Sequence, residues 1–473
     1  MRGFLASSIA VTCAVLTLPL APPATAAGPV AGSAVPGSTQ SLPLVPLTGS
    51  RAPGAAAERG LAPRTVRSFS LVGVVWDDPA AELHGHVRIR TRAHGTDRWS
   101  GWQELEAHNQ DHGPDPDTGE GRSNRMRGST APLWVGDSDG VQVWVRAEVA
   151  GPGATRVPKL PEGLRVELVD PGREPREDAP AQTPYPHGDP GVPGAGAPGP
   201  GAGAFGTAPS AGAIESVVDG GLAPLNALEI PRPSKKPTAT TDPARSTQPT
   251  AKAWKAWKAG EGAATAGRPQ QPYVGPRPPI VSRSGWGADE SLREGGFLYT
   301  NTVKAAFVHH TASGNNYSCS QAASLIRSIY RYHVVSSGWR DIGYNFLVDK
   351  CGNIYEGRAG GVEKPVMGAH TLGFNGDTTG IAVIGTYTGT APSAAAVDAL
   401  ARLTAWKLGL FGRDPRAKTY LVSAGGNLYA KGENVRLNVI SGHRDGYATE
   451  CPGRLLYGEL GLVRSAAARY QGR

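Results

Sequence analysis

The stretch "KAAFVHH", residues 304–310, decides how the C-terminal part of this 473-residue chain folds. Its apolar run followed by two histidines is typical of a short buried strand that ends on polar side chains. A second stretch, "RLNVISGH" at 436–443, has the same form and also ends on a histidine. Because the ends of neighbouring strands open onto a shared cleft, we expect these histidines to lie close together.

Helical and strand patterns alternate around these two stretches. A capping-box pair, Ser318 and Gln321, predicts the start of a helix that continues to Gly338. The other expected elements are a hairpin over 344–357, a buried strand over 380–387, a helix over 393–411 and a helix with Pro452 at its first position. Together they predict an α/β domain over 276–473, in which helices flank a mixed β-sheet.

The chain begins like an exported protein. Arg2 is followed by an apolar run over 4–20 and by small residues at 24–26, which is the order of a cleaved secretory signal over 1–26. An uncleaved anchor is the alternative, but prolines shorten the apolar run below the roughly 20 residues of a membrane-spanning helix. No later stretch is long and apolar enough to span a membrane, so we expect a secreted or cell wall-associated protein.

Composition divides the residues between the signal and the C-terminal domain. Alternating polar and apolar residues, as in "HGHVRIRTRA" at 84–93, predict half-buried strands, and we assign an all-β, sandwich-like module to 65–170. Gly, Pro, Ala and Thr dominate 171–275, a composition that buries too little apolar surface to fold. We therefore expect a flexible linker there and a flexible N-terminal segment over 27–64. Wall binding and a spacer role both remain open for the β module.

The cysteine count restricts the possible roles of each thiol. Of the four cysteines, Cys13 leaves with the signal, so an odd number remains in an oxidising compartment. We expect Cys319 and Cys351 to form a disulfide that joins the start of the first helix to the hairpin turn. Cys451 then needs another role.

His309, with its neighbour His310, and His443 end two strands, and Cys451 lies in the loop after the second strand. Two imidazoles and a thiolate with an open fourth position match a catalytic zinc set. A competing interpretation makes Cys451 a nucleophile that His443 activates. That interpretation needs no metal, but it leaves His309 without a role.

Several stretches of the C-terminal domain resemble, in order, the signatures of the peptidoglycan recognition protein domain, the type 2 N-acetylmuramoyl-L-alanine amidase family. They are "VHHTA" (308–312), "GWRDIGYNFLVDKCGNIYEGR" (338–358), "GAHTLGFN" (368–375), "GIAVIGTY" (380–387) and "GHRDGYATECPG" (442–453). The resemblance covers residues 280 to 470, approximately, and includes neither the β module nor the linker.

The resemblance implies that His309, His443 and Cys451 bind Zn²⁺, with His309 rather than His310 as the first ligand. Members of the family that only bind peptidoglycan have typically lost the cysteine. Its presence here favours an enzyme, and a non-catalytic peptidoglycan-binding protein is the alternative. The implied reaction is hydrolysis of the amide between the lactyl group of N-acetylmuramic acid and the L-alanine of the stem peptide.

Further roles are carried over from the matching motifs. Tyr344 matches the catalytic tyrosine that positions the water or binds the oxyanion, and Thr449 falls where the family has a group that stabilises the transition state. His370 and Asn375 lie in a segment that lines the peptide groove of the family, and Arg358 follows the hairpin near it. We therefore expect these three residues to bind substrate.

The expected partner is peptidoglycan, through its stem peptide and muramic acid. The net charge of +8 suits an anionic wall polymer, and nucleic acid is not expected outside the cell. A Gly-Trp pair that the family associates with diaminopimelate recognition is absent from "EGRAGGVEKPVMGAH" (356–370), so the preference at the third stem residue is not carried over. We expect a monomer.

Overall fold

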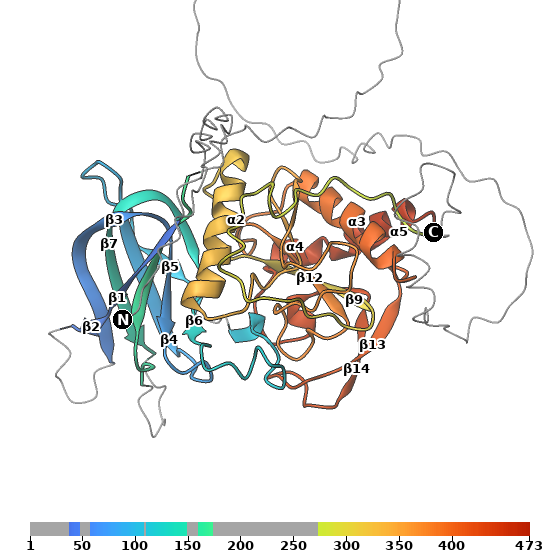
Figure 1. Ribbon diagram of the computed structural model, residues 1–473, viewed down its shortest axis with the longest axis horizontal. Helices are drawn as coiled ribbons and strands as arrows, with labels where there is room; N and C mark the ends of the chain where they lie inside the picture. The colour runs from blue at the N-terminus through green and yellow to red at the C-terminus, as the bar shows by residue number, and fades with distance from the viewer. Residues whose placement is uncertain (1–36, 48–56, 108–109, 149–158, 174–272) are drawn as a thin grey trace, which may run out of the picture.

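The computed structural model describes residues 37–47, 57–107, 110–148, 159–173 and 273–473. The predicted signal sequence and nearly all of the predicted linker lie outside these residues. The described chain forms an N-terminal β module and a C-terminal α/β domain, which pack against each other (Figure 1). The predicted all-β class of the N-terminal module and the predicted mixed sheet with flanking helices are confirmed, but the described strands of the module pair into one sheet rather than into the two sheets of the expected sandwich.

Every strand pairing in the N-terminal module is antiparallel. The strands form one eight-stranded sheet in the order β1-β8-β3-β7-β4-β5, with β2 and β6 paired to β3. Along β4, Val87 and Ile89 are buried while Arg88 is exposed, which is the alternation that the sequence predicts. The strands are β1 (Ser38–Pro43), β2 (Val45–Pro46), β3 (Glu58–Trp76), β4 (Gly85–Ala93), β5 (Gln103–Leu105), β6 (Gly128–Ser129), β7 (Leu133–Ala147) and β8 (Arg165–Asp170).

This sheet begins earlier in the chain than the sequence predicts. β1 pairs with β8 along its whole length, and β3 starts at Glu58. Both strands begin inside the segment 27–64 that we expected to be flexible, so the predicted start of the module at residue 65 is wrong. The sequence of β1, "STQSLP", has little apolar character, and its partner strand lies more than a hundred residues away.

The C-terminal domain is built on a five-stranded mixed sheet in the order β11-β10-β12-β9-β15. β10 and β11 form the predicted antiparallel hairpin, whereas β10, β12, β9 and β15 are mutually parallel. The strands are β9 (Ala305–His310), β10 (Phe346–Val348), β11 (Ile354–Glu356), β12 (Thr378–Val383) and β15 (Ile440–Gly442). A separate antiparallel pair consists of β13 (Lys418–Val422) and β14 (Asn434–Asn438).

Helices cover both faces of this sheet. On one face, α3 (Ala394–Gly409) and α5 (Leu460–Tyr470) bury a core that includes Val308 of β9. On the other face, α2 (Ala322–Arg331) packs over β10 and β12, while Ala305 and Phe307 of β9 contribute to a smaller core. The remaining helical segments are η1 (Gln110–His112), η2 (Cys319–Gln321), η3 (Tyr332–Ser336), η4 (His443–Asp445) and α4 (Arg454–Gly458).

Two expected elements differ in detail. The stretch 436–443 was expected to be one strand, but β14 takes its first part into the small antiparallel pair and β15 takes its last part into the main sheet. The chain therefore changes sheets near Val439. Pro452 precedes the N-cap residue Gly453 of α4 and is not the first helical residue. The hairpin, the capping box at Ser318 and the helix α3 are confirmed.

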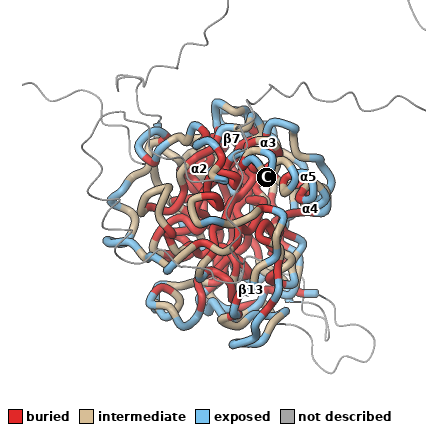
Figure 2. Tube along the Cα trace, turned by 90° about the vertical axis from the view of Figure 1, so that its right-hand side faces the viewer, coloured by how far each residue is buried: buried red, intermediate tan, exposed pale blue. Residues whose placement is uncertain are grey.

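The β module docks on the outer side of α2, which lies between the two sheets (Figure 1). Leu71 and Val169 of the module share one apolar core with Ile326 of α2. The hydroxyl of Tyr332 donates a hydrogen bond to the carbonyl of Thr130 at 3.1 Å. Close contact here requires glycine at position 73, because a Cβ atom there would lie 2.3 Å from the Tyr332 hydroxyl oxygen. Buried residues fill the interior of the molecule (Figure 2).

Among the helices of the described residues, none has both the length and the apolar character to cross a bilayer. The predicted disulfide is confirmed, since Cys319 at the start of η2 is bonded to Cys351 at the hairpin turn. It closes a loop with a sequence separation of 32 residues.

Replacing Cys319 and Cys351 together by serine is expected to lower the free energy of unfolding by about 3 to 4 kcal/mol, because the open chain regains loop entropy when it unfolds. Chemical denaturation of the C-terminal domain, followed by tryptophan fluorescence, measures the change. An unchanged midpoint would contradict the predicted contribution of the loop.

Candidate metal centre

The two histidine-bearing strand ends meet as the sequence predicts. β9 and β15 are adjacent and parallel, and their register pairs Gly442 with Val308. The next residues along the two strands, His443 and His309, therefore lie at the same level. Their rings are 4.5 Å apart, and Cys451 returns to them from the loop after η4.

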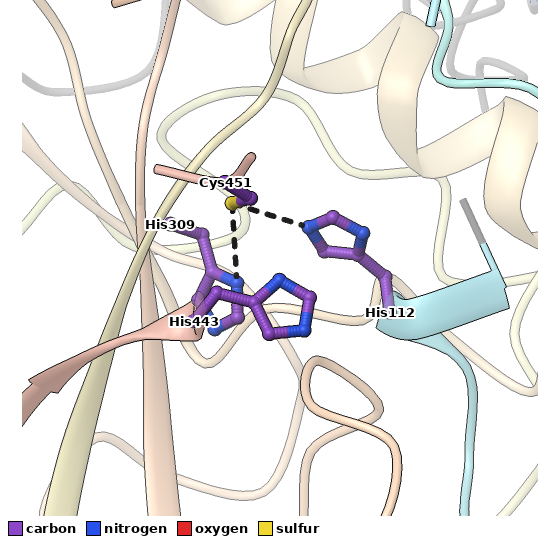
Figure 3. A group of neighbouring side chains, drawn as sticks. All are labelled: His112, His309, His443 and Cys451. Atoms are coloured by element: carbon purple, nitrogen blue, oxygen red, sulfur yellow. Dashed lines mark hydrogen bonds between the residues drawn. The ribbon is translucent and has the colours of Figure 1, made fainter. Parts of the chain in front are cut away.

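A fourth side chain completes the cluster, and it comes from the β module. His112 of η1 lies beside Cys451, His309 and His443, and one ligand atom from each of the four residues lies within 4.8 Å of the others (Figure 3). All four side chains are buried, and His112 retains 6 % of its exposure. The open fourth position that the sequence predicts is thus taken by a histidine from a distant part of the chain.

Each histidine uses one nitrogen for a hydrogen bond and leaves the other nitrogen for the cluster. His443 donates from Nε2 to the carbonyl of Asp111 at 3.1 Å, and its buried Nδ1 has no hydrogen-bond partner among the described residues. His112 contacts the Asp111 carboxylate through Nδ1 at 2.8 Å and directs Nε2 at Cys451. His309 has Nε2 3.3 Å from His370 and directs Nδ1 at Cys451. This division is typical of histidines that bind metal.

The spacing of the donor atoms fits a tetrahedral ion. The Sγ atom of Cys451 lies 3.7 Å from Nε2 of His112 and 3.8 Å from Nδ1 of His309. Ligands at the usual zinc–sulfur and zinc–nitrogen distances would be separated by about 3.5 Å. The donor set of three imidazoles and a thiolate is also one that zinc prefers. The cluster therefore has the donor types and the spacing to hold a metal ion.

Burial determines the protonation of the cluster in the metal-free protein. Desolvation lowers the pKa of His443 to about 3 and keeps the pKa of His309 well below its ordinary value, with neighbouring histidines adding to the effect. Both imidazoles are therefore neutral at pH 7 and carry a free lone pair. Desolvation, reinforced by Asp111, raises the pKa of the Cys451 thiol well above its ordinary value. A thiolate at this position requires a compensating cation.

His310 faces away from the cluster. Its Nδ1 accepts a hydrogen bond from the backbone of Tyr387 at 3.4 Å, and its Nε2 lies 3.6 Å from the Glu106 carboxylate. Successive side chains of a strand point to opposite faces of the sheet, so only one of the two adjacent histidines can enter the cluster. The structure brings His309 to the cluster.

Tyr344 and Thr449 each lie next to residues of the cluster. The ring of Tyr344 lies 5.6 Å from that of His309 and 5.8 Å from that of His112. Burial raises the pKa of the Tyr344 hydroxyl well above its ordinary value, so this hydroxyl stays protonated at neutral pH. The hydroxyl oxygen of Thr449 accepts a hydrogen bond from the backbone nitrogen of Cys451 at 3.2 Å.

The three expected substrate-binding residues occupy different environments. His370 is completely buried behind His309 and is held by the side chain of Thr371, so it supports the cluster. Asn375 and Arg358 instead reach the surface that the β module covers. Neither of these two side chains is open to solvent in this structure.

An acidic segment of the β module, residues 110–120, covers this surface and is held by backbone and side-chain contacts. The backbone nitrogen of Leu372 donates to the carbonyl of Asp111 at 2.8 Å. The amide of Asn375 donates to the carbonyl of Gly113 at 3.0 Å and to the carboxylate of Asp115 at 2.9 Å. The acidic segment therefore lies directly on the predicted groove.

The acidic segment also forms a buried ion pair with the groove. Arg358 donates two hydrogen bonds to the Glu120 carboxylate, at 2.8 and 3.0 Å, and both side chains are almost fully buried. The backbone nitrogen of Arg340 adds a third hydrogen bond to the same carboxylate at 3.1 Å. Nearer the surface, Lys431 pairs with Asp117 at 2.5 Å.

Comparisons with known proteins find matches to both parts of the chain. A family model described as "N-acetylmuramoyl-L-alanine amidase" matches residues 299–454, and one described as "Rv3811 N-terminal galactose-binding domain-like" matches 23–182. Peptidoglycan-recognition protein SC2 of Drosophila melanogaster is 35 % identical over 184 residues, which are 38 % of this chain and 84 % of the relative. The chain belongs to the peptidoglycan recognition protein family.

Two further members of the peptidoglycan recognition protein family match a similar share of this chain. Peptidoglycan-recognition protein SC1a of Drosophila melanogaster is 31 % identical over 181 residues, which are 38 % of this chain and 83 % of the relative. A solved structure of peptidoglycan recognition protein-LE, in complex with tracheal cytotoxin, is 32 % identical and covers 39 % of this chain and 92 % of that chain, with a TM-score of 0.31.

Sequence reasoning missed the contribution of the β module to this site. His112 lies in "NQDHGPDPDTGEG" (109–121), a stretch rich in Asp, Gly and Pro that resembles an ordinary surface loop. Its spacing from His309 is almost two hundred residues, so no local motif links the two. The peptidoglycan recognition family signatures also end at the border of the C-terminal domain. Only the accumulation of acidic residues around one histidine distinguishes the stretch.

We expect the purified chain to bind a single divalent metal ion in this centre. Replacing Cys451 by serine or His443 by alanine removes a donor atom, and the metal content should then fall to near zero after dialysis. The matched control is His310→Gln, which changes the neighbouring histidine outside the cluster and should keep its metal. Mass spectrometry measures the moles of metal bound per mole of protein. Equal metal content in all variants would contradict the assignment.

Burial raises the pKa of Asp115 to about 6, although hydrogen bonds from Gly373 and Asn375 oppose the shift. Because the pKa of Asp115 is raised in the docked state, the protonated acid favours docking. This contribution is complete below the pKa that Asp115 has in the unfolded chain, and it is lost as the pH rises through about 6. Asp115→Asn is therefore expected to stabilise the protein by about 1 to 3 kcal/mol at pH 7.5, and by nothing below pH 4. Denaturation midpoints of both proteins across this pH range test the sign.

Proposed function

We propose that this protein is an exported, zinc-dependent N-acetylmuramoyl-L-alanine amidase, which hydrolyses the amide between the lactyl group of N-acetylmuramic acid and the L-alanine of peptidoglycan. The observation that carries the proposal is the buried group of His309, His443 and Cys451 at the carboxyl ends of parallel strands. Membership of the peptidoglycan recognition protein family supports the substrate class.

The residues of the centre fit zinc, because one donor atom from each lies within 4.8 Å of the others and the buried Nδ1 of His443 has no hydrogen-bond partner in the described part of the chain. A zinc ion held there would polarise the amide carbonyl and lower the pKa of a bound water toward about 7. Asp111 and His370 fix the ring orientations of the ligands through their other nitrogens.

Tyr344 and Thr449 are suited to stabilise a developing oxyanion. The raised pKa of Tyr344 keeps its hydroxyl as a hydrogen-bond donor, which an oxyanion requires. Thr449 supplies a second hydroxyl close to Cys451. Arg358 and the amide of Asn375 offer donors for the carboxylates and carbonyls of a stem peptide.

The environment of Cys451 counts against a cysteine hydrolase. A nucleophilic cysteine needs a lowered pKa, whereas burial raises the pKa of this thiol well above its ordinary value. The nearest histidine nitrogens belong to His309 and His112, at 3.8 and 3.7 Å, and both imidazoles converge on the sulfur as co-ligands would.

Incubation of purified peptidoglycan with the full chain is expected to release stem peptides that begin with a free alanine amine and to leave lactyl carboxyl groups on the glycan. Cys451→Ala should abolish this release. Tyr344→Phe, which keeps the ring and removes one oxyanion donor, should lower kcat by about 10²- to 10³-fold. Mass analysis of the soluble and insoluble products measures both effects.

Chelation separates an amidase from a protein that only binds peptidoglycan. Removing the metal is expected to stop stem-peptide release while the protein still sediments with insoluble peptidoglycan, because the groove residues are unchanged. If the metal-loaded protein binds the polymer but never generates new alanine amines, the non-catalytic alternative replaces the amidase proposal.

A further inference from the structure

The β module supplies a histidine that is prepared to bind metal. The Nδ1 atom of His112 is held by the Asp111 carboxylate at 2.8 Å, which orients the ring and leaves Nε2 directed at the cluster. The ring lies 4.5 Å from that of His443 and 5.3 Å from that of His309. A histidine that merely packed against the domain would not need both a carboxylate partner and a nitrogen aimed at the other ligands.

A fourth protein ligand changes what the centre can do. Hydrolytic zinc sites keep one position free of protein ligands for water and substrate, whereas sites closed by four side chains are structural. With His112 in place, His309, His443 and Cys451 form a closed set. The described conformation is therefore suited to retain a metal but not to hydrolyse an amide.

The acidic segment, residues 110–120, also takes the contacts that a stem peptide would need. Its Glu120 carboxylate holds the guanidinium of Arg358 through two hydrogen bonds. Its Gly113 carbonyl and Asp115 carboxylate occupy the amide of Asn375. Backbone carbonyls and carboxylates are the groups that an acidic peptide presents, so the segment resembles a ligand of the groove in its chemistry.

The acidic segment is held by polar contacts rather than by a core. In the part of the chain that the structure describes, no residue from 110 to 127 belongs to an apolar core, whereas the module itself shares a core with α2 through Leu71 and Val169. Beyond the short helical turn η1, residues 113–120 contain no helix or strand, and this stretch is rich in Gly and Pro. The segment can therefore leave the groove while the rest of the module stays docked on α2.

We propose that the protein is self-inhibited: His112 is a fourth ligand of the metal centre, and the acidic segment occupies the peptidoglycan-binding groove until it is displaced. The identity of the excluded ligand rests on the proposed function, but the coordination by His112 does not. Opening requires that Arg358, Asn375 and the fourth ligand position become free together.

The test of the metal ligand uses the full chain loaded with Co²⁺, whose visible spectrum reports the coordination sphere. The wild-type spectrum is expected to change little on addition of azide, because the closed form, in which no position is open, holds about nine-tenths of the molecules. His112→Ala should open one position, so that azide shifts the spectrum. His84→Ala is the matched control, since it makes the same change at an exposed histidine of the same module. A spectrum of His112→Ala that matches the wild type with and without azide would overturn the proposal.

The test of the groove uses Glu120→Gln, which keeps the side-chain shape and removes the charge that pairs with Arg358. A soluble muramyl tripeptide is expected to bind this variant about tenfold more tightly than the wild type. This factor is expected because only the open form binds the peptide, and the closed form holds about nine-tenths of the wild-type molecules. Arg122→Ala, an exposed change in the same loop, should leave the affinity unchanged. Equal affinities for wild type and Glu120→Gln would contradict groove occupancy.

Activity then separates the two proposals. His112→Ala should release stem peptides about tenfold faster than the wild type if the amidase assignment is correct. An azide-sensitive Co²⁺ spectrum together with tighter peptide binding, but without any stem-peptide release, would support self-inhibition and count against the amidase. An unaltered spectrum in an active His112→Ala protein would overturn self-inhibition and leave the amidase intact.

Discussion

The burial of four metal-binding side chains at one edge of a parallel sheet is the constraint on which the rest of the site depends. An imidazole nitrogen without a hydrogen-bond partner is costly to bury, and the Nδ1 atom of His443 has none within the part of the chain that the structure describes. A bound cation would offset that cost and would stabilise the thiolate that burial alone disfavours. The surrounding carboxylate and histidine contacts are the supports that such a centre needs.

Much of the C-terminal fold follows from local sequence patterns. The apolar run before His309, the hairpin around Cys351 and the helix after Ser393 are decided by neighbours within a few residues, and each forms where the sequence predicts. The choice of His309 over His310 follows from the alternation of a strand, once the buried face is known. The sequence alone does not say which face that is.

The features that sequence reasoning missed depend on contacts between distant parts of the chain. β1 has little apolar character and is a strand because β8 is its partner. The pattern of 436–443 predicts one strand, yet its first part pairs with β13 and its last part pairs with β9, with the change at Val439. His112 is the extreme case, because it reaches the other three residues only when the β module is docked on the C-terminal domain. Pairing of this kind leaves no periodicity in the sequence.

The position of the β module is fixed by its apolar contact with α2. The polar contacts of the acidic segment alone would not fix it. The apolar core that Leu71 and Val169 share with Ile326 fixes the module, and the segment is then delivered to the groove at a high effective concentration. Weak polar contacts suffice under that condition. The buried pair of Glu120 and Arg358 is favourable only while both partners stay together, since either charge alone would be buried without compensation.

If the acidic segment is displaced as proposed, the pair of Glu120 and Arg358 would be the first contact that an acidic ligand competes for. If a peptide carboxylate replaces Glu120 at Arg358, the acidic segment loses the ion pair that lies C-terminal to His112. The hydrogen bonds of Asp115 with Asn375 and Gly373 then remain to hold this part of the segment. Burial opposes ionisation of Asp115, so at neutral pH these contacts hold a carboxylate that is better solvated when free. An acidic ligand therefore competes with a segment that is bound through a few charged groups, chiefly Glu120 and Asp115. Displacing one of these groups leaves fewer contacts to keep the other in place.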